Sequence, residues 1–274
     1  MAEATKWYAV VTGANKGIGF EICKQLASKG ITVIVTARDE RRGIEALDKL
    51  KQHIDLNLSH NNNVLFHQLD VTDPNSIASL ENFIRTHFGK LDILVNNAGL
   101  LTEKEELTEA CIKTNYYGAK GLTKALIPLL QFSSSPKIVN VSSSMGRLEN
   151  IPNGWPKEVL SDVENLTEEK IDQVLNEFLK DFKEGSLESK GWPLNVSAYS
   201  VSKVALSAYT RILAKKYPSI CINAICPGYI KTDINDHTGS LTPYEGAEPI
   251  VRLALLNDGS PSGLFFFRYE DKPY

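Results

Sequence analysis

The sequence has few of the features that would direct a protein to a membrane or a nucleic acid. Its 30 Lys and Arg residues nearly balance its 33 Asp and Glu residues and are interspersed with them, which leaves no strongly basic or acidic region. No apolar run approaches the length of a membrane span, and the first residues, MAEATK, lack the apolar core of a signal peptide. We therefore expect a cytoplasmic protein with no nucleic-acid or membrane partner.

Cysteine is scarce, and its spacing suggests no special chemistry. The four cysteines, Cys23, Cys111, Cys221 and Cys226, have neither the spacing of metal ligands nor that of a disulfide framework. Reduced thiols and no metal site are expected. With 42% hydrophobic and 23% charged residues, the 274-residue chain can form a full core as one large α/β domain or two small ones.

A regular alternation of β-prone and helical segments runs through most of the chain. Short apolar runs predict strands at 7–11, 32–37, 64–69, 93–95, 138–141, 222–225 and 264–267. Amphipathic segments between them include helices at 74–88, 107–132 and 245–256. The pattern predicts an α/β fold with a doubly wound, mostly parallel seven-stranded sheet of the Rossmann type, as a single domain over 1–274. It stops at about 147–191, where an acidic helix over 160–182 indicates a helical insertion.

The first predicted strand runs directly into a glycine-rich turn and a helix. The turn, TGANKGIG, spaces its glycines as Gly-x3-Gly-x-Gly. Glycines allow a backbone to approach a pyrophosphate closely, and the N-terminus of the following helix favours its negative charge. The turn is therefore a candidate dinucleotide site formed by Gly13, Asn15, Lys16, Gly17, Ile18 and Gly19.

The end of the second predicted strand favours NADP(H) over NAD(H). An acid there would bind the adenosine ribose, whereas an arginine can bind a 2′-phosphate. Here the strand ends at Ala37 and Arg38 follows, with Lys16 in the glycine turn. The next residue, Asp39, either reaches the ribose or caps the following helix.

Polar and small residues follow three further predicted strands. Asp70 and Val71 follow the third strand, where Asp70 either binds the adenine amino group or serves as a turn residue. The fourth strand is followed by Asn97, Ala98 and Gly99, and the fifth by Ser142-Ser143-Ser144. The carboxyl ends of parallel strands share one edge of the sheet, so we expect all these residues in the crevice that receives the nucleotide.

Tyr199 and Lys203 are the candidate acid–base pair. They are four residues apart in a helix-compatible run, which places them on one helix face. A nearby ammonium favours phenolate and should lower the tyrosine pKa from about 10 toward a range suited to proton donation. Such a spacing also arises often by chance, so its weight depends on the motifs upstream.

Together, these motifs resemble the short-chain dehydrogenase/reductase family over nearly the whole chain. The matching residues are TGANKGIG, NNAG at 96–99, Asn115, the three serines, Tyr199 with Lys203, and Pro227-Gly228. The resemblance implies that Tyr199 donates a proton to a substrate carbonyl and Ser143 orients that carbonyl, with Ser142 and Ser144 as alternatives. It also implies that Lys203 holds the nicotinamide ribose and Asn115 maintains a water-linked proton path. Four residues would flank the nicotinamide: Pro227, Gly228, Ile230 and Thr232.

The long insertion resembles that of carbonyl reductases in particular. Several runs look closest to the plant branch with menthone/neomenthol reductases, isopiperitenone reductase and salutaridine reductase. This resemblance implies NADPH-dependent reduction of a hydrophobic monoterpenoid or alkaloid ketone, with reduction of a conjugated C=C bond or non-catalytic NADPH binding as alternatives. It also implies a monomer, because the insertion covers the surface used for dimerisation, unless the acidic helix leaves that surface open.

The substrate pocket is the least determined part of the site. Five residues at strand ends and insertion edges are candidates for an apolar wall, although each could equally belong to the core: Met145, Trp155, Trp192, Tyr229 and Ile234. The segment from Gly99 to Asn115 is shorter than in the relatives named above, either by deletion or because residues are missing from the sequence.

Overall fold

The computed structural model describes residues 6–53, 63–152 and 154–274. Residues 1–5, most of the MAEATK segment in which no signal-peptide core was found, lie outside the described part. So do residue 153 and the polar segment 54–62 before the third strand.

One sheet forms the centre of the fold. Its strands are ordered, from edge to edge, β3 (Val64–Gln68), β2 (Thr32–Ala37), β1 (Tyr8–Val11), β4 (Ile93–Asn96), β5 (Lys137–Val141), β6 (Cys221–Cys226), β7 (Phe265–Phe267) and β8 (Glu270–Lys272). All pair in parallel except β7 with β8. Because β1 pairs with both β2 and β4, the chain changes direction across the sheet there, and ligands bind at the carboxyl side of such a switch point.

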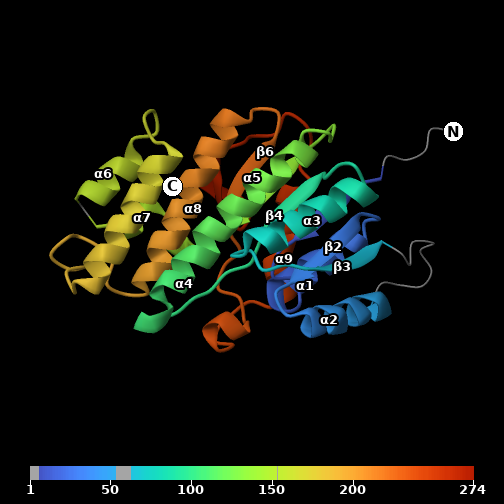
Figure 1. The fold of residues 1–274 in the computed structure, drawn as a ribbon, viewed down its shortest axis with the longest axis horizontal. Coiled ribbons are helices and arrows are strands. Elements are labelled where there is room, and N and C mark those ends of the chain that lie inside the picture. Colours follow the sequence, from blue (N-terminus) through green and yellow to red (C-terminus); the bar gives the residue numbers. More distant parts are fainter. Residues whose placement is uncertain (1–5, 54–62, 153) are drawn as a thin grey trace.

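Helices cover both faces of the sheet. The first cluster of buried side chains joins the sheet to helices on one face, including α3 (Pro74–His87), α5 (Ala119–Leu130) and α8 (Ser197–Lys216). The second joins the opposite face to α1 (Gly17–Ala27), α9 (Pro243–Ala254) and the end of α2 (Glu40–His53). Figure 1 shows α3, α5, α8 and α7 (Glu168–Lys183) as a row of helices, with α7 on the outer side of α8. The predicted α/β doubly wound fold is thus confirmed.

The sheet has one strand more than predicted. Within the described residues the sheet has eight strands rather than seven, because the short strand β8 pairs antiparallel with β7 at the edge. All three residues of β8 are polar and exposed, so the sequence shows no alternation of apolar and polar residues there.

The long helix expected over 107–132 is divided into three parts. α4 (Thr108–Ile112) leads into a π-helical segment, Lys113–Gly118, and α5 follows. Within the π-helical segment, Gly118 packs so closely on Val71 that a Cβ would lie 2.7 Å from the Val71 Cγ2 atom. Single π-helical turns occur often at functional sites, and this one carries Asn115.

The insertion also contains two helices rather than one. α6 (Trp155–Ser161) ends before Asp162, whose carboxylate accepts a hydrogen bond from the Asn165 backbone N–H at 3.2 Å. α7 begins only after Thr167, whose hydroxyl accepts a hydrogen bond from the Lys170 N–H at 3.3 Å. These local bonds stop and restart the helix inside the range predicted as continuous.

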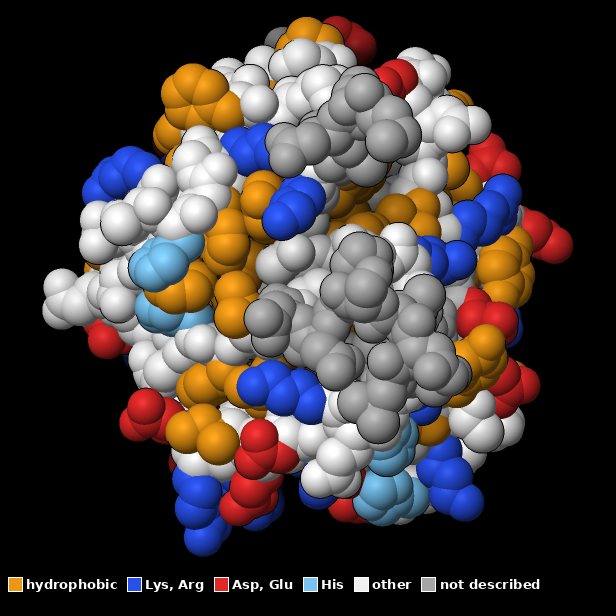
Figure 2. Space-filling model, turned by 90° about the vertical axis from the view of Figure 1, so that its right-hand side faces the viewer, with side chains coloured by type: hydrophobic (Ala, Val, Ile, Leu, Met, Phe, Trp, Pro, Cys, Tyr) orange, Lys and Arg blue, Asp and Glu red, His pale blue; other side chains and the backbone are white. Residues whose placement is uncertain are grey.

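Acidic and basic side chains are mixed on the face shown in Figure 2, with hydrophobic side chains between them. Among the described residues, no helix is both long enough and apolar enough to cross a membrane.

Candidate active site

A cavity of about 930 Å³ lies at the carboxyl ends of the strands. It brings together residues from almost every motif identified in the sequence. The predicted residues that line it are Gly13, Asn15, Lys16, Gly17, Ile18, Gly19, Arg38, Asp70, Val71, Asn97, Ala98, Gly99, Ser143, Met145, Tyr199, Lys203, Pro227, Gly228, Tyr229, Ile230, Thr232 and Ile234. Asn115, Trp155 and Trp192 do not line it.

The glycine turn has a geometry suited to the phosphates of a dinucleotide. Gly13 and Gly17 have φ of 61° and 57°, values that side chains disfavour, and α1 starts at Gly17 without a side-chain cap. Asn97 holds the turn through hydrogen bonds from its Nδ2 atom to the carbonyls of Thr12 (2.8 Å) and Gly13 (3.2 Å). Across the turn, the Thr232 hydroxyl is buried and has no hydrogen-bond partner in the part of the chain that the structure describes. The uncapped N–H groups and this hydroxyl fit an anionic ligand.

Arg38 is the basic residue best placed for a 2′-phosphate. Among the described residues no carboxylate pairs with Arg38, which is exposed at the end of β2 and lines the cavity. Lys16, by contrast, is paired with Asp233. Asp39 accepts a hydrogen bond from the Arg42 N–H at 2.9 Å, so the alternative that Asp39 caps α2 is correct.

Asp70 acts as a turn residue at the wall of the cavity. Its carboxylate accepts hydrogen bonds from the backbone N–H of Thr72 at 2.9 Å and from the Thr72 hydroxyl at 2.7 Å. Asp70 also lines the cavity next to Val71. Its place in the cavity wall is therefore compatible with the adenine contact considered from the sequence.

Tyr199 and Lys203 lie one turn apart on α8 and face the cavity. The Lys203 Nζ atom lies 5.7 Å from the centre of the Tyr199 ring and donates a hydrogen bond to the Val141 carbonyl at 2.7 Å. Burial lowers the pKa of Lys203 to about 8. Burial raises the pKa of Tyr199 to about 12, and a hydrogen bond with the Ser143 side chain opposes this rise. The expected lowering of the tyrosine pKa was wrong, because desolvation on burial outweighs the hydrogen bond with Ser143.

The structure distinguishes the three serines that follow β5. The Ser142 hydroxyl is buried and lies within hydrogen-bond distance of the Lys203 carbonyl (3.3 Å) and the Ser207 hydroxyl (3.0 Å). The Ser144 side chain interacts with Cys226. Ser143 is the serine whose side chain reaches Tyr199, and its hydroxyl also accepts a hydrogen bond from the Met145 N–H at 3.2 Å. Its position therefore supports the choice of Ser143.

Asn115 lies beneath the cavity, with 1% of its surface exposed. Its Nδ2 atom donates to the Leu100 carbonyl at 2.8 Å and to the Ser202 hydroxyl at 3.0 Å, and its Oδ1 atom accepts from the Leu100 N–H at 2.7 Å. A Cβ added at Gly99 would lie 3.4 Å from Asn115 Oδ1 and 3.5 Å from Lys203 Nζ. The polar ends of the Asn115 and Lys203 side chains thus both lie next to Gly99.

Two of the five predicted pocket-wall residues lie elsewhere. Trp192 is 2% exposed, donates a hydrogen bond from Nε1 to Asp181 at 2.8 Å and packs edge-on against Phe178. Trp155 starts α6 and is partly exposed on the insertion. Neither lines the cavity: α6, which holds Trp155, packs on α7, and Trp192 follows the insertion and also packs on α7.

Comparison with known proteins identifies the family. Residues 7–154 match the model described as short chain dehydrogenase, and residues 185–254 match one described as Enoyl-(Acyl carrier protein) reductase. The chain belongs to the short-chain dehydrogenase/reductase family.

Within this family, the reductase falls in a branch with plant and carbonyl-reductase members. It is 54% identical to (+)-neomenthol dehydrogenase of Capsicum annuum, with 98% of this chain and 99% of that protein aligned. It is 38% identical to carbonyl reductase [NADPH] 1 of Rattus norvegicus over 94% of each chain. The structure of salutaridine reductase from Papaver somniferum superposes with a TM-score of 0.90 at 49% identity, covering 95% of this chain and 99% of that one. The reductase is thus an oxidoreductase of the carbonyl reductase type.

The connection between β4 and α4 is short in this reductase. The alignment with the Capsicum annuum protein runs over 313 positions, more than the 274 residues of this chain. The relative therefore contains residues that this chain lacks. Residues 97–107 alone join the two elements, and Leu100 and Leu101 in this stretch line the cavity.

Several cavity residues were not identified from the sequence. They include Leu100, Leu101, Val196, Cys226, Asp233 and His237. The rule that ligands bind at strand carboxyl ends points to the last residue of β6, Cys226, and to the segments after β4 and β6, which hold the others except Val196. Val196 has φ of 42°, a strained conformation for a β-branched residue, and no sequence signal marks it.

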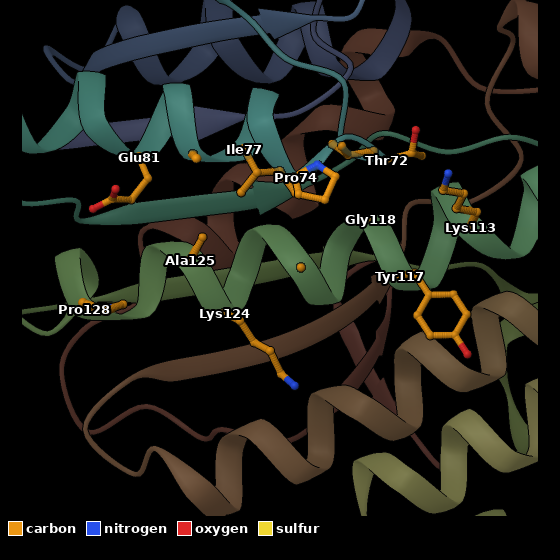
Figure 3. Close-up of a pocket in the computed structure, with 13 residues that line it drawn as sticks. Thr72, Pro74, Ile77, Glu81, Lys113, Tyr117, Gly118, Lys124, Ala125 and Pro128 are labelled. Carbon is orange, nitrogen blue, oxygen red and sulfur yellow. The ribbon is translucent and has the colours of Figure 1, made fainter.

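A second cavity of about 590 Å³ lies between α3 and α5, as Figure 3 shows. Val71 and Thr72 line both cavities. Its other walls include Pro74, Ile77 and Tyr117, and none of the proposed catalytic residues reaches it. The larger cavity is therefore the candidate active site of the reductase.

Proposed function

We propose that this reductase uses NADPH to reduce a ketone on a hydrophobic small molecule, of the monoterpenoid or alkaloid type, to the alcohol. The observation that carries the proposal is the position of Tyr199 beside Ser143 on the wall of the cavity, above the buried Lys203. A carbonyl needs a proton donor at its oxygen when it is reduced. Tyr199 is such a donor at neutral pH, since a pKa of about 12 keeps its hydroxyl protonated.

Each of the four residues has its own role in this reaction. When bound, NADPH supplies the hydride that reaches the carbonyl carbon. Tyr199 donates its proton to the carbonyl oxygen, and Ser143 donates a hydrogen bond that orients the same oxygen. Lys203 lies under the tyrosine ring, where its ammonium stabilises the phenolate left after proton transfer. Asn115, fixed to Leu100, completes a polar path from Lys203 along which Tyr199 is reprotonated.

The choice of NADPH rests on Arg38. Its guanidinium is free to bind a 2′-phosphate through two hydrogen bonds, as carboxylate and phosphate groups favour. A relative named carbonyl reductase [NADPH] 1 supports the same choice.

The class of substrate follows from the apolar side of the cavity. Leu100, Leu101, Met145, Tyr229 and Ile234 line the cavity and contribute little hydrogen-bonding capacity beyond the Tyr229 hydroxyl. Neomenthol dehydrogenase and salutaridine reductase are named for terpenoid and alkaloid compounds of this hydrophobic character.

The proposal is tested by following NADPH oxidation at 340 nm with menthone, isopiperitenone, a morphinan dienone and a simple quinone, with analysis of the products. Alcohol formation from menthone or the dienone is expected. The Tyr199→Phe variant should lose about 10²- to 10⁴-fold in kcat, while its Kd for NADPH stays near that of the wild type.

Tyr217→Phe is the matched control, because it removes a hydroxyl at the far end of the same helix. If Tyr199→Phe reduces ketones as fast as this control, the proton-donor role is wrong. If isopiperitenone alone reacts and gives the saturated ketone, the enzyme reduces a C=C bond instead.

A further inference from the structure

A loop of residues 227–242, here called the strap, follows β6 and borders the active-site cavity. Its two ends are joined by backbone hydrogen bonds from the Lys231 N–H to the Leu241 carbonyl (2.7 Å) and from the Leu241 N–H to the Tyr229 carbonyl (3.1 Å). Gly239 packs directly on the backbone of Ile230, where a Cβ would lie 2.2 Å from the carbonyl carbon. The base of the strap is therefore closely packed and well fixed.

The tip of the strap, residues 232–238, turns back on itself. Asp236 and His237 both have positive φ, at 49° and 59°, and the His237 N–H donates to the Thr232 carbonyl at 2.9 Å. This turn brings the His237 Nε2 atom to 3.0 Å from the Asp233 Oδ1 atom. One carboxylate oxygen of Asp233 is thus supported from within the strap.

The other carboxylate oxygen of Asp233 reaches across the cavity entrance. Its Oδ2 atom pairs with the Lys16 ammonium, which belongs to the glycine turn 217 residues earlier in the chain. Next to this pair, a Cβ added at Gly17 would lie 3.3 Å from the Thr232 Cγ2 atom. The strap tip therefore rests on the glycine turn, and the unpartnered Thr232 hydroxyl is buried at this contact.

We propose that Asp233, supported by His237, is a positioning residue that latches the strap to Lys16 and slows the release of the bound dinucleotide. This inference rests on the proposed use of a nicotinamide dinucleotide. The latch closes beside the glycine turn, which faces the pyrophosphate. NADPH and NADH share the pyrophosphate, so the latch acts on both.

The latch is weak enough to open in each catalytic cycle. The Lys16 and Asp233 side chains are 57% and 52% exposed, and exposed ion pairs contribute little in water. We therefore expect loss of the pair to speed dinucleotide release by about two- to fivefold rather than to abolish binding. High salt should have a similar effect on the wild type, because it screens an exposed pair.

The test is a stopped-flow measurement of the dissociation rates of NADPH and NADH from the full chain. Asp233→Asn removes the charge with little change in shape, and Asp236→Asn is the matched control. Asp236 lies on the same strap, forms no ion pair among the described residues and does not line the cavity. Asp233→Asn should release both dinucleotides about two- to fivefold faster than Asp236→Asn, and high salt should remove the difference.

Three results would overturn the latch. They are equal rates for the two variants, slower release of NADPH alone from Asp233→Asn, and no recovery of slow release in Asp233→Glu. Slower release of NADPH alone would mean that Asp233 only competes with the 2′-phosphate for Lys16. A melting temperature equal to that of the control shows that Asp233→Asn folds.

Failure of the latch is distinguishable from failure of the proposed function. If the wild type binds neither dinucleotide, the proposed function is wrong, and the proposed latch, which depends on it, is wrong as well. If the wild type binds NADPH and reduces ketones while the two variants release it equally fast, only the latch is wrong.

Discussion

Arg38 is the residue on which the proposed choice of NADPH rests. It lines the cavity without a carboxylate partner among the described residues, whereas Arg41, three residues along the chain, is 3.9 Å from Glu45 and lies outside the cavity. The contrast makes Arg41 a suitable control for the charge removed at Arg38.

Arg38→Ala should weaken the binding of NADPH far more than that of NADH, because only NADPH carries the 2′-phosphate. Hydrogen bonds to charged groups contribute about 1.5–3 kcal/mol, so we expect the Kd for NADPH to rise by about 10- to 150-fold. Fluorescence titration with both dinucleotides measures the effect, with Arg41→Ala as the control. An equal loss for NADPH and NADH would show that Arg38 does not bind the 2′-phosphate.

Lys203 reduces the stability of the folded protein at neutral pH. Burial lowers its pKa from 10.5 to about 8, so between these pH values the unfolded chain binds more protons than the folded one. The free energy of unfolding therefore rises with pH across this window. Below pH 8 the buried ammonium costs about 3 kcal/mol, a cost consistent with a functional role.

At pH 7 the free energy of unfolding of Lys203→Met should exceed that of the wild type by up to about 3 kcal/mol. The variant should therefore unfold at a higher urea concentration. Loss of the hydrogen bond to the Val141 carbonyl offsets part of this gain. The difference should shrink as the pH approaches 10.5, while ketone reduction is lost at every pH. Lys215→Met, exposed on the same helix, is the control, and equal effects of the two variants at pH 7 would contradict the prediction.

At the scale of elements, α7 is held to α5 and α8 by a group of ion pairs. Glu168 lies 2.5 Å from Lys124, 3.6 Å from Lys120 and 3.7 Å from Lys216, and only 10% of its side chain is exposed. Burial alone would raise the pKa of Glu168, but the three ammonium groups outweigh it and hold the pKa below its usual range. The insertion is therefore attached by charge as well as by its apolar stripe.

Glu168→Gln should lower the free energy of unfolding by about 1–3 kcal/mol at pH 7, because three ammonium groups lose their shared partner. In the wild type this stabilisation is present above the unfolded glutamate pKa and is lost as the pH falls through the lower folded value, so the two proteins should converge in acid. Urea unfolding at pH 7 and at acid pH measures this. Glu177→Gln, which affects an exposed pair on the same helix, should have little effect.

At the scale of the whole molecule, α7 occupies the outer sides of α5 and α8. Figure 1 shows it alongside α8, and Lys120, Lys124 and Lys216 pair with it from the two covered helices. A helix in this place prevents a second copy from packing against the same surface.

We propose on this basis that the reductase is a monomer. Sedimentation equilibrium should give a mass near 30.4 kDa across the accessible concentration range. Glu168→Gln tests whether the attached α7 keeps the surface covered, because loosening it should raise the mass toward that of a dimer at high concentration. A dimer of the wild type would show that the insertion leaves an interface open.

Much of the fold and site could be predicted from the sequence because the relevant signals are local. Apolar runs predicted β1 to β7, and the glycine spacing predicted the turn after β1. The carboxyl edge of the sheet, and with it most of the cavity residues, could be predicted from these elements. The polar strand β8, the π-helical segment at Asn115 and the break between α6 and α7 had no such signal. They depend on pairing with β7, on packing against Val71 and on capping by Thr167.

The sequence by itself determined the order of strands and helices, the glycine turn and the residues available for chemistry, because periodicity and turn preference act over a few neighbouring residues. Only the tertiary structure decided that Ser143 rather than Ser142 reaches Tyr199, that Trp192 is core, and that Asp233 meets Lys16. It also decided that desolvation raises the pKa of Tyr199. Burial and contacts between residues far apart in the chain depend on how the whole chain packs, and no local pattern records them.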